Sequence, residues 1–272
     1  STLTSQGAPV TLKALELGAF DFIAKPTDKS SQSLSYFGDE LCAKVKSASC
    51  ANLRLIREPA SSQIASHAVQ GDRLIAIGAS TGGTEALREL LIPLTPPFPP
   101  IVIAQHIPKH FSSAFAKRLN DNCRLTVIEV TRDQVIEPNH VYIAPGDRHL
   151  KVHKSGRGYT CQLVDGPAVN RHKPSVDVLL ESVAASYGDK AIGVMLTGMG
   201  KDGAEGLLTM RKAGALTIAQ DEASSVVWGM PGASVRLGAV MDILSLPLIA
   251  PKLAMLVQKK TDTVTRKSYD TI

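Results

Sequence analysis

Short, uninterrupted apolar segments alternate with helical patterns from residue 73 onward, and this alternation restricts the possible folds more than any other feature. Leu74–Ile77 and Ile101–Ala104 contain only apolar residues, and a helical pattern follows each of them. The same order returns at Ala191–Leu196. Strands without alternating polar residues are buried on both faces, which is typical of parallel sheets covered by helices. The sequence therefore predicts a doubly wound, mostly parallel, Rossmann-like α/β fold.

Other predicted elements follow the same periodicities. Apolar residues at helical spacing continue after the first strand through Leu87–Leu91. We expect further strands at Val127–Val130, Val141–Ile143 and Leu216–Ala219, a hairpin over Leu150–Val164, and helices at Ser112–Leu119, Val176–Ala185 and Gly203–Ala213.

The first 50 residues predict the second half of an α/β unit without its first half. The helical pattern of Val10–Leu17 ends at Gly18, which suits a helix C-terminus because glycine tolerates positive φ. Phe20–Ala24 predicts a short strand, and apolar residues recur at helical spacing over Leu34–Val45. We divide the chain into this incomplete unit (1–50), an exposed linker rich in Ser, Ala and Gln (51–71), a main domain (72–258) and a polar tail (259–272).

The composition excludes several classes of protein. An apolar fraction of 44% and a mean hydropathy of +0.04 favour a packed core over disorder. The net charge of +5 is spread along the chain without a basic block, which argues against a nucleic-acid platform. No apolar run approaches the roughly 18 residues of a membrane span, and the four widely spaced cysteines suggest reduced thiols. We therefore expect a cytoplasmic protein without nucleic-acid binding or membrane insertion.

Polar residues follow three predicted strands at their carboxyl ends, where open α/β sheets bind ligands. Gly78–Gly83 contains the G-x-S-x-G form, in which a sharp strand-to-helix turn exposes a serine, here Ser80. His106 follows the second strand and Asp202 follows the third. Imidazole is the usual base for a hydroxyl nucleophile, and a carboxylate can hold that imidazole in one tautomer. The three residues together predict a Ser–His–Asp hydrolase.

Two other interpretations stay open on spacing alone. Gly198–Gly203 fits the G-x-G-x-x-G pattern of dinucleotide-binding turns, and Asp221 follows at about the distance of a ribose-binding acid. That interpretation leaves Ser80 and His106 without a role. A catalytically idle signalling module is the second alternative, and the complete triad argues against it.

Two H-x-x-x-H pairs do not favour a metal site. Pro108 interrupts any helix that would align His106 with His110. His149 and His153 lie on a predicted strand, where residues four apart are too distant to share one ion. We expect no bound metal.

Longer segments, spread over residues 74–256, resemble the chemotaxis response-regulator protein-glutamate methylesterases/protein-glutamine glutaminases, the CheB family. The matching segments are Ile75–Leu87, Gln105–Pro108, Ile143–Asp147, Leu196–Gly203, Ala219–Glu222 and Val227–Pro231. Ser225 stands where many relatives have cysteine, a change that we expect to be neutral.

The resemblance implies a role for each matched residue. Ser80 would be the nucleophile, His106 the general base and Asp202 the carboxylate that orients the imidazole. The backbone N–H groups of Thr81 and Met199 would form the oxyanion hole. The resemblance implies no cofactor.

The implied reaction is hydrolysis of γ-glutamyl methyl esters on chemoreceptors, with release of methanol. Family members often deamidate receptor glutamines by the same route, and the reaction serves adaptation in bacterial chemotaxis. The implied partners are the methyl-accepting receptors as substrates and the histidine kinase of the chemotaxis system, which acts through a complete receiver domain.

The first 50 residues resemble the C-terminal part of a flavodoxin-like receiver domain. Ser1 would be the switch hydroxyl and Lys25 the phosphate-contacting lysine. The phospho-accepting aspartate would lie upstream, so we expect an N-terminally truncated chain that phosphorylation cannot switch. In the family the receiver blocks the catalytic site, and we expect residues 1–50 to be loosely held or docked on the catalytic domain.

Overall fold

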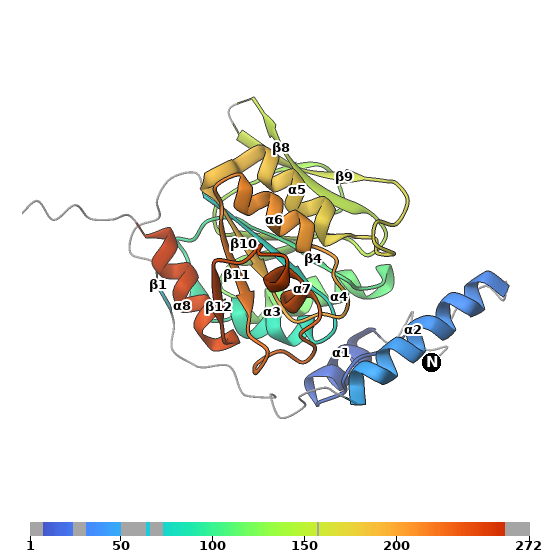
Figure 1. The fold of residues 1–272 in the computed structure, drawn as a ribbon. Helices are drawn as coiled ribbons and strands as arrows, with labels where there is room; N and C mark the ends of the chain where they lie inside the picture. The colour runs from blue at the N-terminus through green and yellow to red at the C-terminus, as the bar shows by residue number, and fades with distance from the viewer. Residues whose placement is uncertain (1–7, 24–30, 50–63, 66–72, 157, 259–272) are drawn as a thin grey trace, which may run out of the picture.

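A parallel sheet of seven strands forms the centre of the protein (Figure 1). The computed structural model describes residues 8–23, 31–49, 64–65, 73–156 and 158–258. In spatial order the strands are β12 (Asp242–Leu244), β11 (Leu216–Gln220), β10 (Ala191–Met195), β2 (Leu74–Ala79), β4 (Ile101–Gln105), β7 (His140–Ile143) and β5 (Thr126–Glu129). Every neighbouring pair of these strands is parallel. The prediction of a mostly parallel α/β sheet is therefore confirmed.

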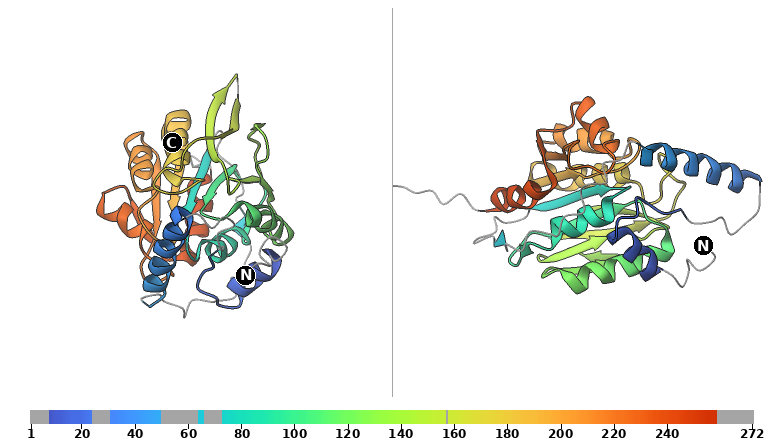
Figure 2. Two further views of the ribbon diagram at one scale, coloured as in Figure 1. Left: turned by 90° about the vertical axis from the view of Figure 1, so that its right-hand side faces the viewer. Right: turned by 90° about the horizontal axis from the view of Figure 1, so that it is seen from below.

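Helices cover both faces of this sheet (Figure 1, Figure 2). The helices of one face are α3 (Gly83–Leu91), α4 (Lys109–Asn122) and α8 (Leu246–Val257), and those of the other are α5 (Val176–Tyr187), α6 (Ala204–Lys212) and α7 (Met230–Arg236). Along β2, Ile75 and Ile77 join the first core, whereas Leu74 and Ala76 join the second. Consecutive strand residues point to opposite faces, so a strand covered on both sides is apolar throughout.

Two smaller pairings of strands complete the sheet structure. A three-stranded sheet contains β6 (Gln134–Val135), β9 (Gly158–Val164) and β8 (His149–Ser155), and a two-stranded one contains β1 (Ile64–Ala65) and β3 (Leu94–Thr95). β8 and β9 are antiparallel and form the hairpin predicted over Leu150–Val164. β1 lies within the predicted linker, where no regular structure was expected. A short 3₁₀ helix (Gly188–Lys190) precedes β10.

The predictions for the first 50 residues are confirmed in part. The helix α1 (Ala8–Glu16) is followed by Gly18 with a φ of 103°, as expected for a helix C-terminus, and α2 (Ser31–Ser49) includes the pattern of Leu34–Val45. The strand predicted over Phe20–Ala24 is wrong for residues 20–23, which have no regular structure, and Ala24 lies outside the described residues. A strand needs a neighbour to satisfy its backbone groups, and the sheets of the described chain include none beside this segment.

The sheet has its topological switch point between β2 and β10. The chain crosses from β2 to β4 on one side and returns much later to β10 on the other side. Ligands bind at such a point, outside the carboxyl ends of the strands. The register pairs Ala79 with Gln105 and Gly78 with Met195, so all three strands end at nearly the same level. The loops that follow β2, β4 and β10 are therefore brought together.

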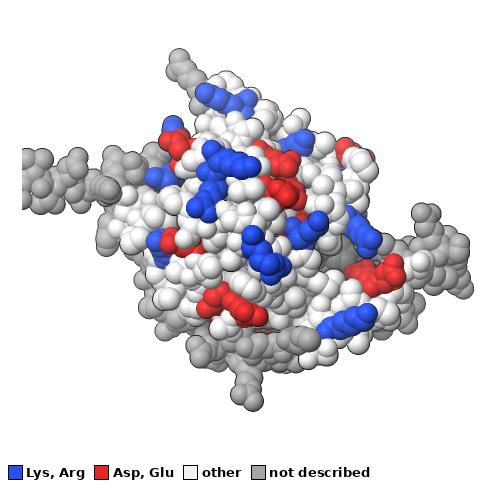
Figure 3. All heavy atoms as spheres, in the orientation of Figure 1, with Lys and Arg blue, Asp and Glu red and all other residues white. Residues whose placement is uncertain are grey.

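Charged side chains of both signs are interspersed on the face seen in Figure 3. This distribution agrees with a modest net charge of +5 that is not gathered in one segment of the sequence. In the part of the chain that the structure describes, no helix combines the length and the apolar character required to span a membrane.

Gly146 allows the loops after β4 and β7 to touch. A Cβ atom on Gly146 would lie 2.3 Å from the backbone nitrogen of Lys109 and 2.4 Å from the carbonyl oxygen of Ile107. Backbone atoms cannot move aside as the end of a flexible side chain can. The loop after β4 carries His106, so this contact also supports the predicted site.

We predict that Gly146→Ala lowers the free energy of unfolding by about 3 kcal/mol, because the new Cβ forces the two loops apart. Gly158→Ala in β9 is the matched control, since no atom lies within 4 Å of its added Cβ. Its free energy of unfolding should change by about 0.5 kcal/mol or less. Urea unfolding of the full chain measures both, and equal midpoints would show that the loops separate without strain.

Candidate active site

The turn after β2 presents Ser80 just before the N-terminus of α3. The Ser80 N–H donates to the carbonyl oxygen of Thr197 (3.0 Å), and the Ser80 carbonyl accepts from the Gly83 N–H (2.7 Å). Gly82 has a φ of 77°, a conformation that glycine adopts without steric cost, whereas Ser80 itself is not left-handed. A Cβ atom on Gly198 would lie 2.8 Å from the Ser80 Cβ. Glycine at 198 therefore allows the loop after β10 to approach the serine.

His106 lies between Ser80 and Asp202, with one ring nitrogen facing each of them. Its Nδ1 is 3.1 Å from Ser80 Oγ, and its Nε2 is 2.8 Å from Asp202 Oδ2. The imidazole and the carboxylate are almost completely buried, with 8% and 1% of their side chains exposed. An ionised carboxylate only accepts hydrogen bonds, so in the neutral ring Nε2 carries the proton and Nδ1 is free to accept one from the serine. This arrangement can generate a serine nucleophile.

The N-terminus of α5 holds the Asp202 carboxylate. Ser175 Oγ and Asn170 Nδ2 each donate to Oδ1 at 2.8 Å, and the Val176 N–H donates to Oδ2 at 2.7 Å. Burial by itself would raise the pKa of this carboxyl. The hydrogen bonds, with the charge of His106, outweigh burial and hold the pKa of Asp202 well below its usual range. Asp202 therefore remains ionised beside the imidazole.

A second buried carboxyl, Asp177, lies next to Asp202. Its Oδ2 accepts from Asn170 Nδ2 (2.6 Å), and its Oδ1 accepts from the Gly206 N–H (2.7 Å). Burial raises the pKa of Asp177, the Gly206 hydrogen bond opposes that shift, and the Asp202 charge adds to it. The Asn170 amide thus bridges two carboxyl groups, only one of which contacts the imidazole.

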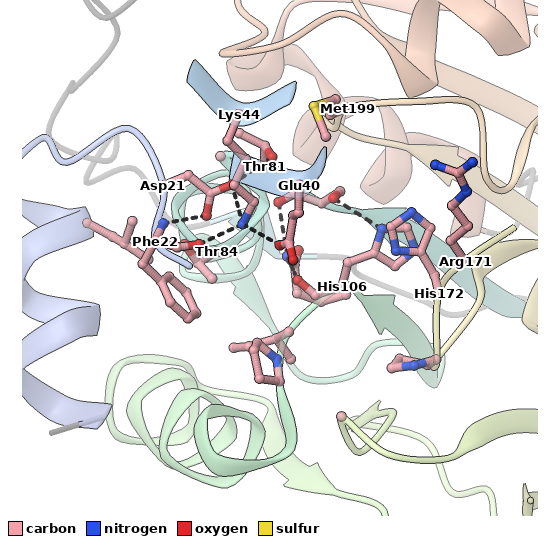
Figure 4. Close-up of a pocket in the computed structure, with 18 of the residues that line it drawn as sticks. Asp21, Phe22, Glu40, Lys44, Thr81, Thr84, His106, Arg171, His172 and Met199 are labelled. Atoms are coloured by element: carbon pink, nitrogen blue, oxygen red, sulfur yellow. Dashed lines mark hydrogen bonds and ion pairs between the residues drawn. The ribbon is translucent and has the colours of Figure 1, made fainter. Parts of the chain in front are cut away.

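The ring of His172 stacks on the ring of His106 (Figure 4). The ring centroids are 3.6 Å apart and the planes are inclined by 10°. Burial lowers the pKa of His172 to about 4, and the facing His106 contributes in the same direction. Near neutral pH, His172 is therefore an uncharged aromatic ring that stacks on the candidate base.

A pocket of about 260 Å³ opens beside Ser80 and His106. A second hollow of about 420 Å³ adjoins it. The two share the lining residues Glu40, Arg171, His172 and Met199. Together they form a groove along the candidate triad, with Ser80 and His106 in its lining.

The N-terminal segment, described over residues 8–23 and 31–49, covers part of this groove (Figure 4). Thr81 Oγ1 donates to Asp21 Oδ2 (2.8 Å), and Ser47 Oγ lies 3.1 Å from the Met199 sulfur. Lys44 Nζ forms an ion pair with the same Asp21 carboxylate at 3.2 Å. These contacts involve both residues whose backbone N–H groups were predicted to form the oxyanion hole.

Apolar packing fixes the same segment to α4. The rings of Phe22 and Phe111 are 4.5 Å apart, and Leu12 of α1 is buried in the core shared with α3 and α4. Arg118 of α4 donates to the Leu12 carbonyl (2.9 Å) and pairs with Glu16 (3.2 Å). The described part of the first 50 residues is therefore docked on the main domain rather than loosely held.

Two residues predicted for the receiver-like part of the chain remain predictions. Ser1 and Lys25 lie outside the described residues.

Within the described ranges, no group of three or more metal-binding side chains comes together. His149 donates from Nε2 to the carbonyl of Pro167 (3.0 Å) and accepts at Nδ1 from the Ser175 N–H (3.1 Å), so its two nitrogens have protein partners.

Packing accounts for the glycine pattern that resembled a dinucleotide-binding turn. The Gly198 N–H donates to the Val227 carbonyl (3.0 Å), and the Gly198 carbonyl accepts from the Met230 N–H (2.8 Å). The Asp221 carboxylate, expected on that interpretation to hold a ribose, accepts from the N–H and Oγ of Ser224 at 2.9 Å and 2.5 Å. The pattern therefore serves the approach of this loop to the serine.

Several buried polar residues of the site were not assigned a role from the sequence. Gln105 Nε2 donates to the Ser80 carbonyl (2.9 Å), and Gln220 Oε1 accepts from the Thr197 N–H (2.8 Å). Each of these glutamines is the last residue of a buried apolar strand, and this position could have identified them. Asn170 and His172 lie where no periodicity marks them, whereas Ser175 and Asp177 lie at the start of the predicted helix Val176–Ala185, without a pattern that indicates contact with Asp202.

The chain is similar to proteins of one family, both in sequence and in structure. The family described as CheB methylesterase matches residues 75–253. The protein-glutamate methylesterase/protein-glutamine glutaminase 1 of Xanthomonas euvesicatoria pv. vesicatoria is 47% identical over 268 residues, which cover 94% of this chain and 75% of the relative. The corresponding enzyme 2 of Saccharophagus degradans is 51% identical over 257 residues, covering 92% and 74%. The crystal structure of the Thermotoga maritima CheB methylesterase catalytic domain superimposes with a TM-score of 0.66 and 38% identity, covering 69% of this chain and 100% of that one.

We predict that His172 makes the stability of the protein depend on pH. Below about pH 6.5 the unfolded chain protonates this imidazole, whereas the folded chain protonates it only near pH 4. The free energy of unfolding should therefore fall as the pH is lowered from 6.5 to 4, by roughly 3 kcal/mol at most from this group. His172→Phe keeps a ring that cannot titrate, and its loss of stability should be smaller by that amount.

Urea unfolding at several pH values measures this difference. Above pH 7 the two proteins should respond to pH in parallel, which provides the internal control. Parallel curves down to pH 4 would contradict the prediction.

Proposed function

The chain belongs to the CheB methylesterase family, and we propose that Ser80, His106 and Asp202 are its catalytic triad. Its activity is that of a protein-glutamate methylesterase/protein-glutamine glutaminase in chemotaxis adaptation. The observation that carries the proposal is the placement of the His106 ring, whose two nitrogens contact Ser80 Oγ and Asp202 Oδ2.

The first half of the proposed reaction forms an acyl-enzyme. Ser80 Oγ attacks the carbonyl carbon of a glutamyl methyl ester while its proton passes to His106 Nδ1. Asp202 stabilises the resulting imidazolium through the Nε2–H hydrogen bond. Collapse of the tetrahedral intermediate breaks the bond to the methoxy oxygen, which takes the proton from Nδ1 and leaves as methanol.

The second half repeats these steps with water. His106 Nδ1 accepts a proton from water as the water oxygen attacks the acyl carbon, and Ser80 Oγ recovers that proton when it leaves. The product is a free glutamate side chain. A glutamine side chain gives the same acyl-enzyme with ammonia as the leaving group, so one site supports both activities.

The proposed oxyanion hole consists of the backbone N–H groups of Thr81 and Met199. Thr81 directly follows the nucleophile, and Gly198, the neighbour of Met199, packs against Ser80. Neither N–H donates a hydrogen bond to another group of the described chain. Two unoccupied donors beside the nucleophile could stabilise a developing negative charge.

We further propose that residues 72–258 are the catalytic domain and act in the cytoplasm on methylated chemoreceptors. Residues 1–50 would be the C-terminal part of a receiver domain, followed by the linker over 51–71, with residues 259–272 as a polar tail. A histidine kinase would act through the complete receiver domain. The support is the resemblance of the first 50 residues to receivers and their docking beside Ser80.

Docking of the N-terminal segment is proposed to restrict substrate access. Asp21 and Lys44 line the pocket that contains Ser80. Asp21 also binds the hydroxyl of Thr81, the residue next to the nucleophile. A substrate side chain that enters this pocket must compete with these contacts.

We predict that Ser80→Ala lowers kcat for methanol release by roughly 10⁴-fold, because the nucleophile of a triad is removed. The assay uses the full chain and membranes with methylated chemoreceptors. Ser155→Ala at the exposed tip of the β8–β9 hairpin is the control and should retain wild-type activity. Residual activity of Ser80→Ala above one per cent would assign the nucleophile elsewhere.

We predict that the double variant Asp21→Ala/Phe22→Ala raises kcat/KM for the same reaction by about 5-fold or more, because a hydrogen bond and a ring contact that hold the segment are lost. Lys117→Ala removes an exposed ion pair with Asp121 within α4 and should leave the rate unchanged. An unchanged rate in the double variant would mean that the docked segment does not limit access.

A further inference from the structure

A two-residue hairpin lies against the candidate triad. The Val169 N–H donates to the His172 carbonyl (3.0 Å), and the His172 N–H donates to the Val169 carbonyl (2.8 Å). Its two central residues, Asn170 and Arg171, have φ values of 52° and 68°. Asparagine is common at the first position of such a turn, but the second position normally requires glycine. An arginine in this conformation persists only where the surroundings hold the backbone.

The first central residue connects the hairpin to the carboxylate of the triad. Asn170 Nδ2 donates to Asp202 Oδ1 at 2.8 Å and to Asp177 Oδ2 at 2.6 Å. Together with Ser175 Oγ, Asn170 fixes Asp202 Oδ1 while Oδ2 faces the imidazole. A carboxylate free to rotate about its Cβ–Cγ bond would not hold His106 Nε2 in one direction.

The last residue of the hairpin connects it to the base of the triad. The His172 ring lies 3.6 Å from the His106 ring and is almost parallel to it. Rotation of the His106 ring about its Cβ–Cγ bond would make its edge clash with the His172 ring. The contact therefore favours the one ring plane in which Nδ1 faces Ser80.

The base of the hairpin is itself fixed on both sides. His149, which is only 3% exposed, binds the Pro167 carbonyl before the hairpin and the Ser175 N–H after it. Lys173 donates to the Gly166 carbonyl (2.9 Å) and also pairs with Asp165. These contacts of His149 and Lys173 hold the hairpin in place independently of its contacts with the triad.

We propose that the Val169–His172 hairpin is a positioning element, the triad clamp, in which Asn170 orients Asp202 and His172 orients His106. The proposal rests on the proposed function of the triad. Neither residue takes part in the covalent steps. Their effect is to keep Ser80 Oγ, His106 Nδ1 and the Asp202 carboxylate in one productive arrangement.

The test measures how fast Ser80 reacts with diisopropyl fluorophosphate in the full chain. Ser80 Oγ bonds to phosphorus, fluoride leaves, and the serine proton passes to His106, so the rate reports triad alignment without a receptor substrate. Asn170→Gly keeps the left-handed backbone and removes only the amide. It should lower the second-order rate constant by about 10-fold. In methanol release, kcat should fall by a similar factor with KM within about 2-fold, as for a group that acts on the transition state alone.

Asn139→Gly is the matched control for that variant. Asn139 also has a left-handed backbone (φ 64°), and its side chain also forms a hydrogen bond, in which Oδ1 accepts from the Phe98 N–H at 2.7 Å. It precedes β7, at the opposite end of the sheet from the site. The control should lose stability but label Ser80 at the wild-type rate below its unfolding temperature.

The role of the stacked ring is tested by two substitutions. His172→Ala should lower the labelling rate constant by about 5-fold, and His172→Phe, which restores a flat ring, should return it to within about 2-fold of wild type. Tyr159→Ala is the control, because it removes one ring of the Tyr159–Tyr187 stack far from the triad. Its labelling rate should be unchanged.

Wild-type labelling rates in both Asn170→Gly and His172→Ala would overturn the proposal. Failure of His172→Phe to restore the rate lost in His172→Ala would overturn the stacking role. The proposed function fails separately: a wild-type chain that is labelled at Ser80 but releases no methanol from methylated receptors would refute it, and the labelling rates would still decide the role of the clamp.

Discussion

The site depends on the parallel pairing of β2 with β4 on one side and with β10 on the other. Ser80 and His106 are 26 residues apart and His106 and Asp202 are 96 apart, yet all three follow strands that end at one level. The His106 N–H donates to the Ala79 carbonyl (3.1 Å), which extends the ladder into the loops themselves. The strand register of the buried sheet therefore determines how Ser80, His106 and Asp202 lie relative to one another.

A buried charge is the second constraint on the site. Asp202 is ionised in the loop between β10 and α6 with almost no access to water, so every hydrogen bond to it compensates for lost solvation. Its partners come from the start of α5, the hairpin before α5 and the loop after β4. Removal of one donor would leave part of a buried charge unsatisfied. The site therefore couples elements that are distant in the sequence.

Much of the sheet and the outline of the site can be predicted from the sequence. β2, β4 and β10 are recognisable because burial on both faces removes polar residues from them. Ser80 and His106 directly follow β2 and β4, and Asp202 lies in the loop after β10. α8 was missed because Pro247 and Pro251 lie within it, and proline argues against a helix. β12 has only three residues, too few to show a period. Asn170 and His172 become visible only in three dimensions, since neither follows a strand or repeats at a regular interval.

The segment that covers the groove is part of the same chain as the groove. A tethered occupant competes at an effective concentration set by its covalent connection, and not by the amount of protein present. Under the proposed docking, dilution therefore cannot clear the site. A substrate gains access only when its local concentration, relative to its dissociation constant, exceeds the effective concentration of the segment relative to its own. On the proposed function, receptors clustered in a membrane would reach that ratio more readily than the same receptors dispersed in solution, so the density of the substrate would control the activity.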